Sequence, residues 1–207
     1  MRIDNKFLSN YPTFVDFRTS KKQDGKNKEA LNLIAETDKT PEELIESGIN
    51  SINSELSNQL LDELLKTDPY YFEQIVADLM TSLGYGETYV TKRSNDGGID
   101  AIVNEDKLGL DRIFIQAKRY ALNNTVPIKE IRDFVGTLEL NGVTKGIFIT
   151  TSSYPSDASI ILQRTPKTVI LIDGKGLMTL LIANNIGVNT EKEFAIKRLD
   201  SDYFNPS

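Results

Sequence analysis

The sequence predicts an α/β domain built from layers of helices and strands, with a helical extension before it. Three observations predict this fold class. Helical spacing of apolar residues occupies 41–66 and 69–83, three strand patterns follow between 88 and 118, and helix and strand patterns then alternate as far as 183. Strands that alternate with amphipathic helices are typical of a sheet covered by helices.

The helical extension begins with a clear start signal. Thr40 stands at the N-cap position, Pro41 follows in the first turn, and Glu43 lies three residues after the cap. Apolar residues continue at helical spacing to residue 66, which predicts one or two helices. A second helix starts at Asp68-Pro69, and its apolar stripe comprises Phe72, Ile75, Val76, Leu79 and Leu83. Glu73 lies at the edge of this stripe, from where it can reach a cleft beside the core.

Three strands are expected next. Residues 88–91 form the first, and in the second Ile99, Ala101 and Val103 alternate with Asp100 and Ile102. The third begins with the apolar residues 113–115 and continues into Gln116-Ala117-Lys118. Because side chains alternate between the two faces of a strand, Gln116 and Lys118 point the same way, and Ile115 and Ala117 point the other way.

The remaining patterns complete the predicted domain. A helix is marked by Ile128, Ile131, Phe134, Val135 and Leu138, and residues 146–151 form a continuous apolar strand of the kind buried on both faces. Residues 158–162 are expected to be helical, 169–172 a strand and 177–183 a helix. Residues 173–176 are interpreted as the connector between the last strand and the last helix.

Pairing the second and third strands brings a carboxylate, an amide oxygen and an ammonium onto one face. A divalent cation and a phosphodiester need such a set. We interpret Asp100 and Gln116 as metal ligands and Lys118 as the group that orients or deprotonates the attacking water, or offsets charge in the transition state. Glu73, or Asp96, would add negative charge to the shell. Each residue alone also fits an ordinary structural role, but the shared phase of the set favours function.

The composition excludes several other mechanisms. The 207 residues include no histidine and no cysteine, so Ser-His-Asp triads, zinc proteases, His-based nucleases and thiolate metal sites cannot form. Oxygen ligands favour Mg²⁺, with Mn²⁺ as a substitute. No apolar run approaches the roughly 18–20 residues of a membrane span. The lack of cysteine suits a reducing cytosol, so a cytoplasmic location is expected.

A formal net charge of -6 shows that the chain as a whole is not a polycation. A strong grip on nucleic acid must therefore be local or be supplied elsewhere. Five basic residues flank the motif and are candidate phosphate contacts: Lys92, Arg93, Arg119, Lys129 and Arg132.

Several segments in order resemble the catalytic domain of the Mrr-type restriction endonucleases, within the PD-(D/E)xK nuclease superfamily. The resemblance covers roughly residues 40–200. Its segments are residues 40–45, 72–76, 84–86, 96–100, 115–120, 131–136 and 142–151. The combination of Gly97-Gly98-Ile99-Asp100 with Gln116-Ala117-Lys118 is specific to this branch of the superfamily.

The resemblance implies a restriction-endonuclease-like core, in which helices flank a mixed central β-sheet, and Mg²⁺-dependent hydrolysis of phosphodiester bonds. It implies type IV restriction of foreign or modified double-stranded DNA, near the bacterial nucleoid. It assigns acidic ligands to Asp100 and Glu73, a ligand role to Gln116, the catalytic lysine to Lys118, and a place in the metal shell to the backbone carbonyl of Ala117. Because cutting both strands needs two active sites, a homo-oligomer is expected.

The resemblance also suggests how the chain is divided. Residues 1–39 are expected to be an irregular linker that trails a winged-helix DNA-reading domain, 40–66 a helical linker, and 67–207 the catalytic domain. Two other functions remain open from the sequence. One is a non-catalytic module for DNA binding or assembly, and the other is a junction-resolving or repair nuclease on the same core.

Overall fold

The structure, a computed structural model, describes residues 39–86, 88–91 and 98–204. The chain divides into two compact units, residues 1–52 and 53–207, and the packing reported below lies within the second. The expected linker 1–39 lies almost wholly outside the described residues. The helices are α4 (Pro41–Lys66), α5 (Pro69–Ser82), α6 (Ile128–Leu140), α7 (Ala158–Leu162), α8 (Gly174–Ala183) and the short 3₁₀ helix η1 (Asp202–Phe204). The strands are β1 (Thr88–Val90), β2 (Ala101–Asn104), β3 (Arg112–Lys118), β4 (Lys145–Thr150) and β5 (Thr168–Ile172).

Helix α4 is one continuous helix and begins with the predicted capping box. The backbone N–H of Thr40 donates to the Glu43 carboxylate at 2.7 Å, and the N–H of Glu43 donates to Thr40 Oγ1 at 3.2 Å. The C-terminal part of α4 contributes Leu60, Leu61 and Leu64 to the core. No helix among the described residues has the length and apolar character needed to cross a membrane.

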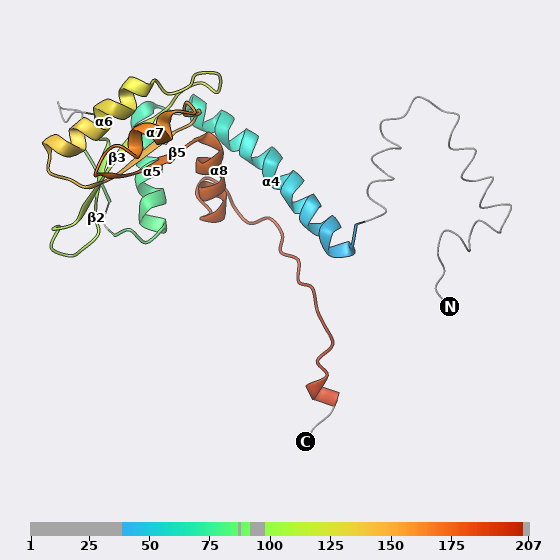
Figure 1. Ribbon diagram of the computed structural model, residues 1–207. Coiled ribbons are helices and arrows are strands. Elements are labelled where there is room, and N and C mark those ends of the chain that lie inside the picture. Colours follow the sequence, from blue (N-terminus) through green and yellow to red (C-terminus); the bar gives the residue numbers. More distant parts are fainter. Residues whose placement is uncertain (1–38, 87, 92–97, 205–207) are drawn as a thin grey trace, which may run out of the picture. The chain divides into compact units, whose positions relative to one another are not determined.

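The five strands form one mixed sheet in the order β1-β2-β3-β4-β5. Strands β1, β2 and β3 are antiparallel neighbours, whereas β3, β4 and β5 run parallel. The parallel pairs need crossover connections, and these contain α6 and α7 (Figure 1). The element order and the mixed sheet match the prediction from sequence.

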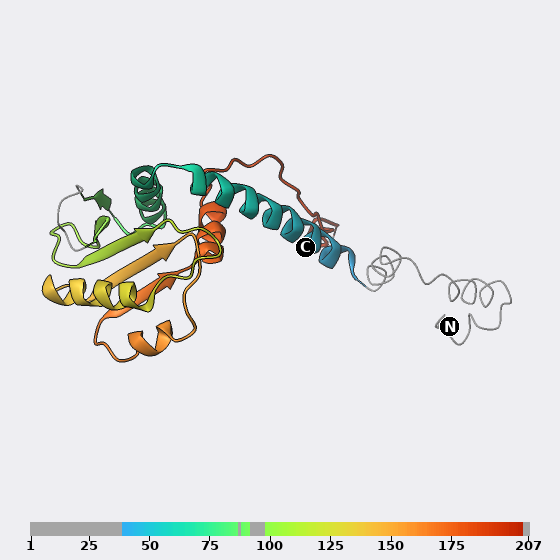
Figure 2. The ribbon, with the colours of Figure 1, turned by 90° about the horizontal axis from the view of Figure 1, so that it is seen from above.

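Helices cover both faces of this sheet (Figure 2). On one face, α5, α8 and the end of α4 pack against the side chains of Ala101, Val103, Ile115 and Ala117. On the other face, α6 and α7 cover a cluster that includes Phe114, Phe134 and Phe148. Since Ile115 and Ala117 belong to the first cluster and Phe114 to the second, β3 alternates as expected, and Gln116 and Lys118 follow the face of Phe114.

One sequence expectation about the second strand is wrong. Ile99 does not share a face with Ala101 and Val103, because it packs in the opposite cluster, with Phe114 and Phe148. The strand begins only at Ala101, and Gly98, three residues earlier, has a φ of +84°. The regular alternation holds within β2 and does not extend back to Ile99.

Candidate active site

The strand pairing brings Asp100 to the end of β3. Ala101 lies opposite Ile115, so Asp100, one residue before β2, stands beside the Gln116-Ala117 segment. The backbone N–H of Ala117 donates to Asp100 Oδ2 at 2.7 Å, and the Asp100 N–H donates to the Ile115 carbonyl at 2.8 Å. Two segments that are far apart in sequence are thus joined directly through the Asp100 carboxylate.

Burial raises the pKa of the Asp100 carboxyl above its ordinary value. The hydrogen bond from Ala117 and the positive charge of Lys118 act in the opposite direction, but burial is the largest cause. A bound cation would favour the ionised carboxylate, as Lys118 does. The environment of Asp100 therefore gains more from an added positive charge than that of a solvated surface acid would.

Gln116 provides a second oxygen in this place. Its side chain is 7% exposed, and its Oε1 is buried without a hydrogen-bond partner among the described residues. The Nε2 atom of the same side-chain amide packs against Gly98, where an added Cβ would lie 2.7 Å from it. A buried acceptor with no donor is rare in folded proteins. A buried amide oxygen and a carboxylate fit the oxygen-rich shell of a hard divalent cation.

Two threonines, whose role the sequence did not predict, hydrogen-bond the backbone at the end of β3, at Lys118 and Tyr120. Thr150 Oγ1 donates to the Lys118 carbonyl at 2.9 Å. The Tyr120 N–H donates to Thr151 Oγ1 at 2.8 Å, and that hydroxyl donates to the Tyr120 carbonyl at 2.7 Å. Both threonines are fully buried. The signal in the sequence was a pair of hydroxyl residues at the end of an otherwise apolar strand.

Glu73 and Ala117 are the two other predicted ligands. Glu73 is half-buried on α5, next to Phe72 in the core. The backbone N–H of Ala117 donates a hydrogen bond to Asp100, and the Ala117 side chain lies in the core. No three acidic side chains within residues 39–86, 88–91 and 98–204 gather into a metal-binding group. Their roles as ligands therefore remain predictions, and Asp96 lies outside the described residues.

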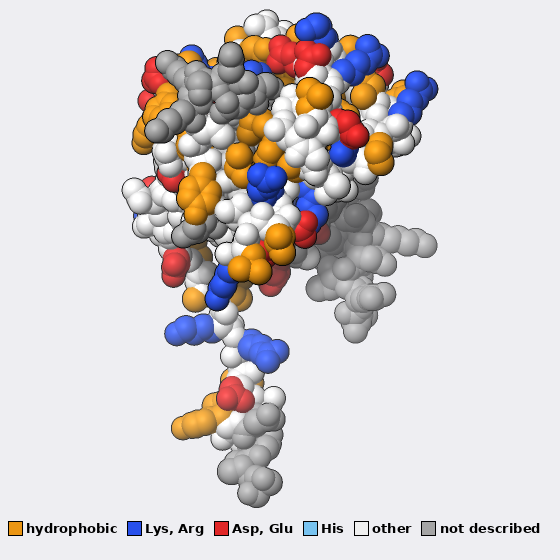
Figure 3. Space-filling model, turned by 90° about the vertical axis from the view of Figure 1, so that its left-hand side faces the viewer, with side chains coloured by type: hydrophobic (Ala, Val, Ile, Leu, Met, Phe, Trp, Pro, Cys, Tyr) orange, Lys and Arg blue, Asp and Glu red, His pale blue; other side chains and the backbone are white. Residues whose placement is uncertain are grey.

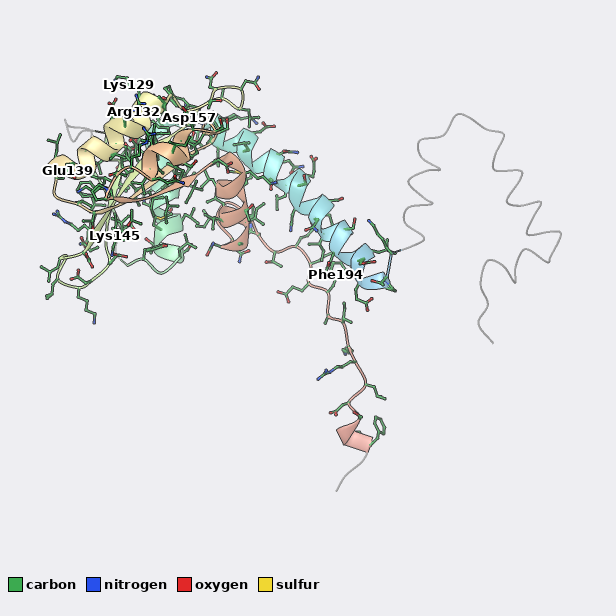
Figure 4. All side chains as sticks on the ribbon, viewed as in Figure 1. Lys129, Arg132, Glu139, Lys145, Asp157 and Phe194 are labelled. Carbon is green, nitrogen blue, oxygen red and sulfur yellow. The ribbon has the colours of Figure 1, made fainter. Side chains whose placement is uncertain are left out.

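The candidate phosphate contacts differ in their surroundings. Lys92 and Arg93 lie outside the described residues. Lys129 and Arg132 are exposed on α6, one turn apart, with Glu139 towards the other end of this helix (Figure 4). Lys129 pairs with Asp133 at 2.9 Å.

Arg119, by contrast, is half-buried and engaged by the protein, since its guanidinium donates to the Leu65 carbonyl in the last turn of α4. On the face drawn in Figure 3, acidic and basic side chains are interspersed with apolar ones, and the described residues form no broad basic surface there.

Residues 64–181 match the model of a family described as restriction endonuclease, the Mrr-type catalytic domain. A type IV methyl-directed restriction enzyme of Escherichia coli (strain K12), EcoKMrr, is 34% identical over 169 residues, which are 80% of this chain and 54% of that enzyme. The chain therefore spans about half the length of this curated relative.

Two solved structures have a similar fold. The DNA modification-dependent restriction endonuclease AspBHI matches with a TM-score of 0.51 and 24% identity, over 64% of this chain and 36% of AspBHI. The MspJI restriction endonuclease, in complex with a 27-mer oligonucleotide, matches with a TM-score of 0.51 and 20% identity, over 66% of this chain and 33% of MspJI. At these identities the likeness concerns the fold alone, which is the restriction-endonuclease-like core expected from the sequence.

Proposed function

Because this chain belongs to the restriction endonuclease family of Mrr-type catalytic domains, matched over residues 64–181, we propose that it is a metal-dependent endodeoxyribonuclease. It would hydrolyse phosphodiester bonds of foreign or modified double-stranded DNA. The observation that carries the proposal is the joining of Asp100 to the Gln116-Ala117-Lys118 end of β3, with the buried Gln116 Oε1 left without a donor.

The proposed ligands are Asp100, Gln116, the carbonyl of Ala117 and Glu73. Two carboxylates and two neutral oxygens leave positions in an octahedral shell for water and substrate phosphates, which suits Mg²⁺; Mn²⁺ would substitute. When bound, the cation polarises the scissile phosphate and lowers the pKa of nearby water.

The residues of the chain prepare the rest of the reaction. Lys118 extends from the end of β3, whose backbone is held by Thr150 and Thr151. Its ammonium would orient the attacking water and offset the negative charge that grows on the phosphate oxygens in the transition state. Burial of Asp100 keeps this carboxylate from the bulk solvent, which strengthens its interaction with a cation.

The proposed activity also involves contacts with DNA and with a second copy of the chain. We expect Lys129 and Arg132 to contact the DNA backbone from α6, with Lys92 and Arg93 as further candidates. Cutting both strands would require two copies of the site, hence a homo-oligomer on DNA. The protein would act in the cytoplasm, where it meets incoming DNA.

The test is cleavage of supercoiled plasmid, methylated and unmethylated, with Mg²⁺, Mn²⁺ or a chelator. We expect metal-dependent nicking that falls by at least about 10²-fold in Asp100→Ala and Lys118→Ala. The matched controls are Asp157→Ala and Lys107→Ala, which remove exposed charges that are not part of the predicted motif. Equal nicking by the site variants and the wild type would overturn the proposal.

Two outcomes would favour the other candidates. Retention of DNA without any metal-dependent cleavage would support a non-catalytic module. Preferential cutting of branched DNA, in a panel with linear and methylated duplexes, would support a junction-resolving or repair nuclease.

A further inference from the structure

Arg119 follows the proposed catalytic lysine directly and makes an unusual contact. Its Nη1 donates to the carbonyl of Leu65, while its Nε is buried without a partner among the described residues. The Leu65 carbonyl is one of the last four carbonyls of α4, and such carbonyls receive no hydrogen bond from a backbone N–H of their own helix. This end of a helix is also the negative end of its dipole, which favours a cation.

The strand geometry separates this contact from the side chain of Lys118. Neighbouring residues of β3 point to opposite faces, so Arg119 continues toward the face of α4 and α5, and Lys118 points toward the face of α6. The backbone on both sides of Arg119 is tied to the end of β4, through Thr150 and Thr151. The segment that carries Lys118 is thus attached to β4 by its backbone and to α4 by one guanidinium.

We propose that Arg119 is a positioning residue, which fixes the end of β3 against the C-terminus of α4 and thereby aligns Lys118 and the Ala117 backbone. This inference rests on the proposed nuclease function. It replaces the interpretation of Arg119 as a phosphate contact. A phosphate contact needs a guanidinium that faces solvent, but here the side chain is half-buried and Nε is closed off from water.

The two roles predict different kinetics. Loss of a phosphate contact weakens DNA binding, so it raises KM and reduces the slope of log K against log salt by about 0.9. Loss of a positioning contact lowers kcat, because a displacement of a catalytic group by about 1 Å can cost roughly 10²-fold in rate. It leaves KM and the salt slope unchanged, because no contact with the DNA is removed.

The experiment compares Arg119→Met, Arg119→Lys and Arg132→Ala in the full chain. We expect kcat to fall about 10- to 100-fold in Arg119→Met, with partial rescue in Arg119→Lys, whose ammonium can still donate to the Leu65 carbonyl. Arg132→Ala, exposed on α6, should instead change the salt slope. A raised KM with an unchanged kcat in Arg119→Met, or a wild-type kcat, would overturn the inference.

A second measurement does not depend on activity. Amide hydrogen exchange in the absence of DNA should be at least about 10-fold faster at Ala117 and Tyr120 in Arg119→Met, and faster by a smaller factor in Arg119→Lys, with Ile147 in the middle of β4 unchanged. Unchanged exchange at Ala117 and Tyr120 in Arg119→Met, or in Arg119→Lys if Arg119→Met fails to fold, would overturn the inference. Absence of DNA cleavage by the wild type would refute the proposed function. The exchange result would still decide whether Arg119 holds the end of β3 in place.

Discussion

Gly98 is the residue at which the smallest chemical change should disturb the site most. Its φ is +84°, and a Cβ at this position would lie 2.7 Å from Nε2 of Gln116. Ordinary contacts begin near 3.4 Å. In Gly98→Ala the Gln116 amide must therefore retreat by about 0.7 Å, the difference between these two distances, or the turn before β2 must shift by a similar amount.

Either movement displaces a proposed metal ligand relative to Asp100. Because misplacement of about 1 Å can cost 10²-fold in rate, we expect the cleavage rate of Gly98→Ala to fall by about 10- to 100-fold, with a higher half-saturating Mg²⁺ concentration. The strain of a left-handed alanine adds a stability loss of about 1 kcal/mol. Plasmid nicking at a series of Mg²⁺ concentrations measures the first effect, and thermal melting measures the second.

Two other glycines separate the displacement from the backbone strain. Gly142 has a φ of +65° with no atom within 4 Å of an added Cβ, and Gly109 has a φ of +68° with ordinary contacts from 3.5 Å. Gly142→Ala and Gly109→Ala should lose similar stability and keep full activity. Full activity in Gly98→Ala, or an equal loss in the two controls, would show that Gln116 is not held in place through Gly98.

Four further outcomes are expected. Asp100→Asn should melt at a higher temperature than the wild type at pH 7 without metal. Burial raises the pKa of Asp100, so folding disfavours the ionised carboxylate that is present at this pH. The gain should vanish at acid pH, where the carboxyl is protonated in both the folded and the unfolded state. Lys118→Met should shift the pH of half-maximal Mn²⁺ binding upward, as seen by calorimetry, because the Lys118 charge holds the pKa of Asp100 down. Gly146→Ala should lose about 1–3 kcal/mol in chemical denaturation, since its Cβ would lie 2.8 Å from Leu138 and Phe134. Gly136→Ala on α6, with nothing within 4 Å, should instead gain about 0.5–1 kcal/mol.

Local patterns in the sequence were enough for most of the architecture. The capping box at Thr40, the apolar stripe of α5 and the alternation in β3 depend on neighbours within a few residues, so they can be recognised without the fold. The shared phase of Gln116 and Lys118 follows from the same alternation. The absence of histidine and cysteine likewise limits the metal ligands to oxygen, whatever the fold.

Other features depended on contacts between distant segments. Ile99 packs with Phe114 and Phe148 on the face opposite to Ala101, and the Arg119 guanidinium donates to the Leu65 carbonyl of α4, 54 residues earlier. The buried acceptor of Gln116 and the hold of Thr150 on the Lys118 carbonyl also appear only when β2, β3 and β4 lie side by side. Periodicity determines which face a side chain takes, whereas its hydrogen-bond partner and its burial are decided by the elements that the tertiary fold packs beside it.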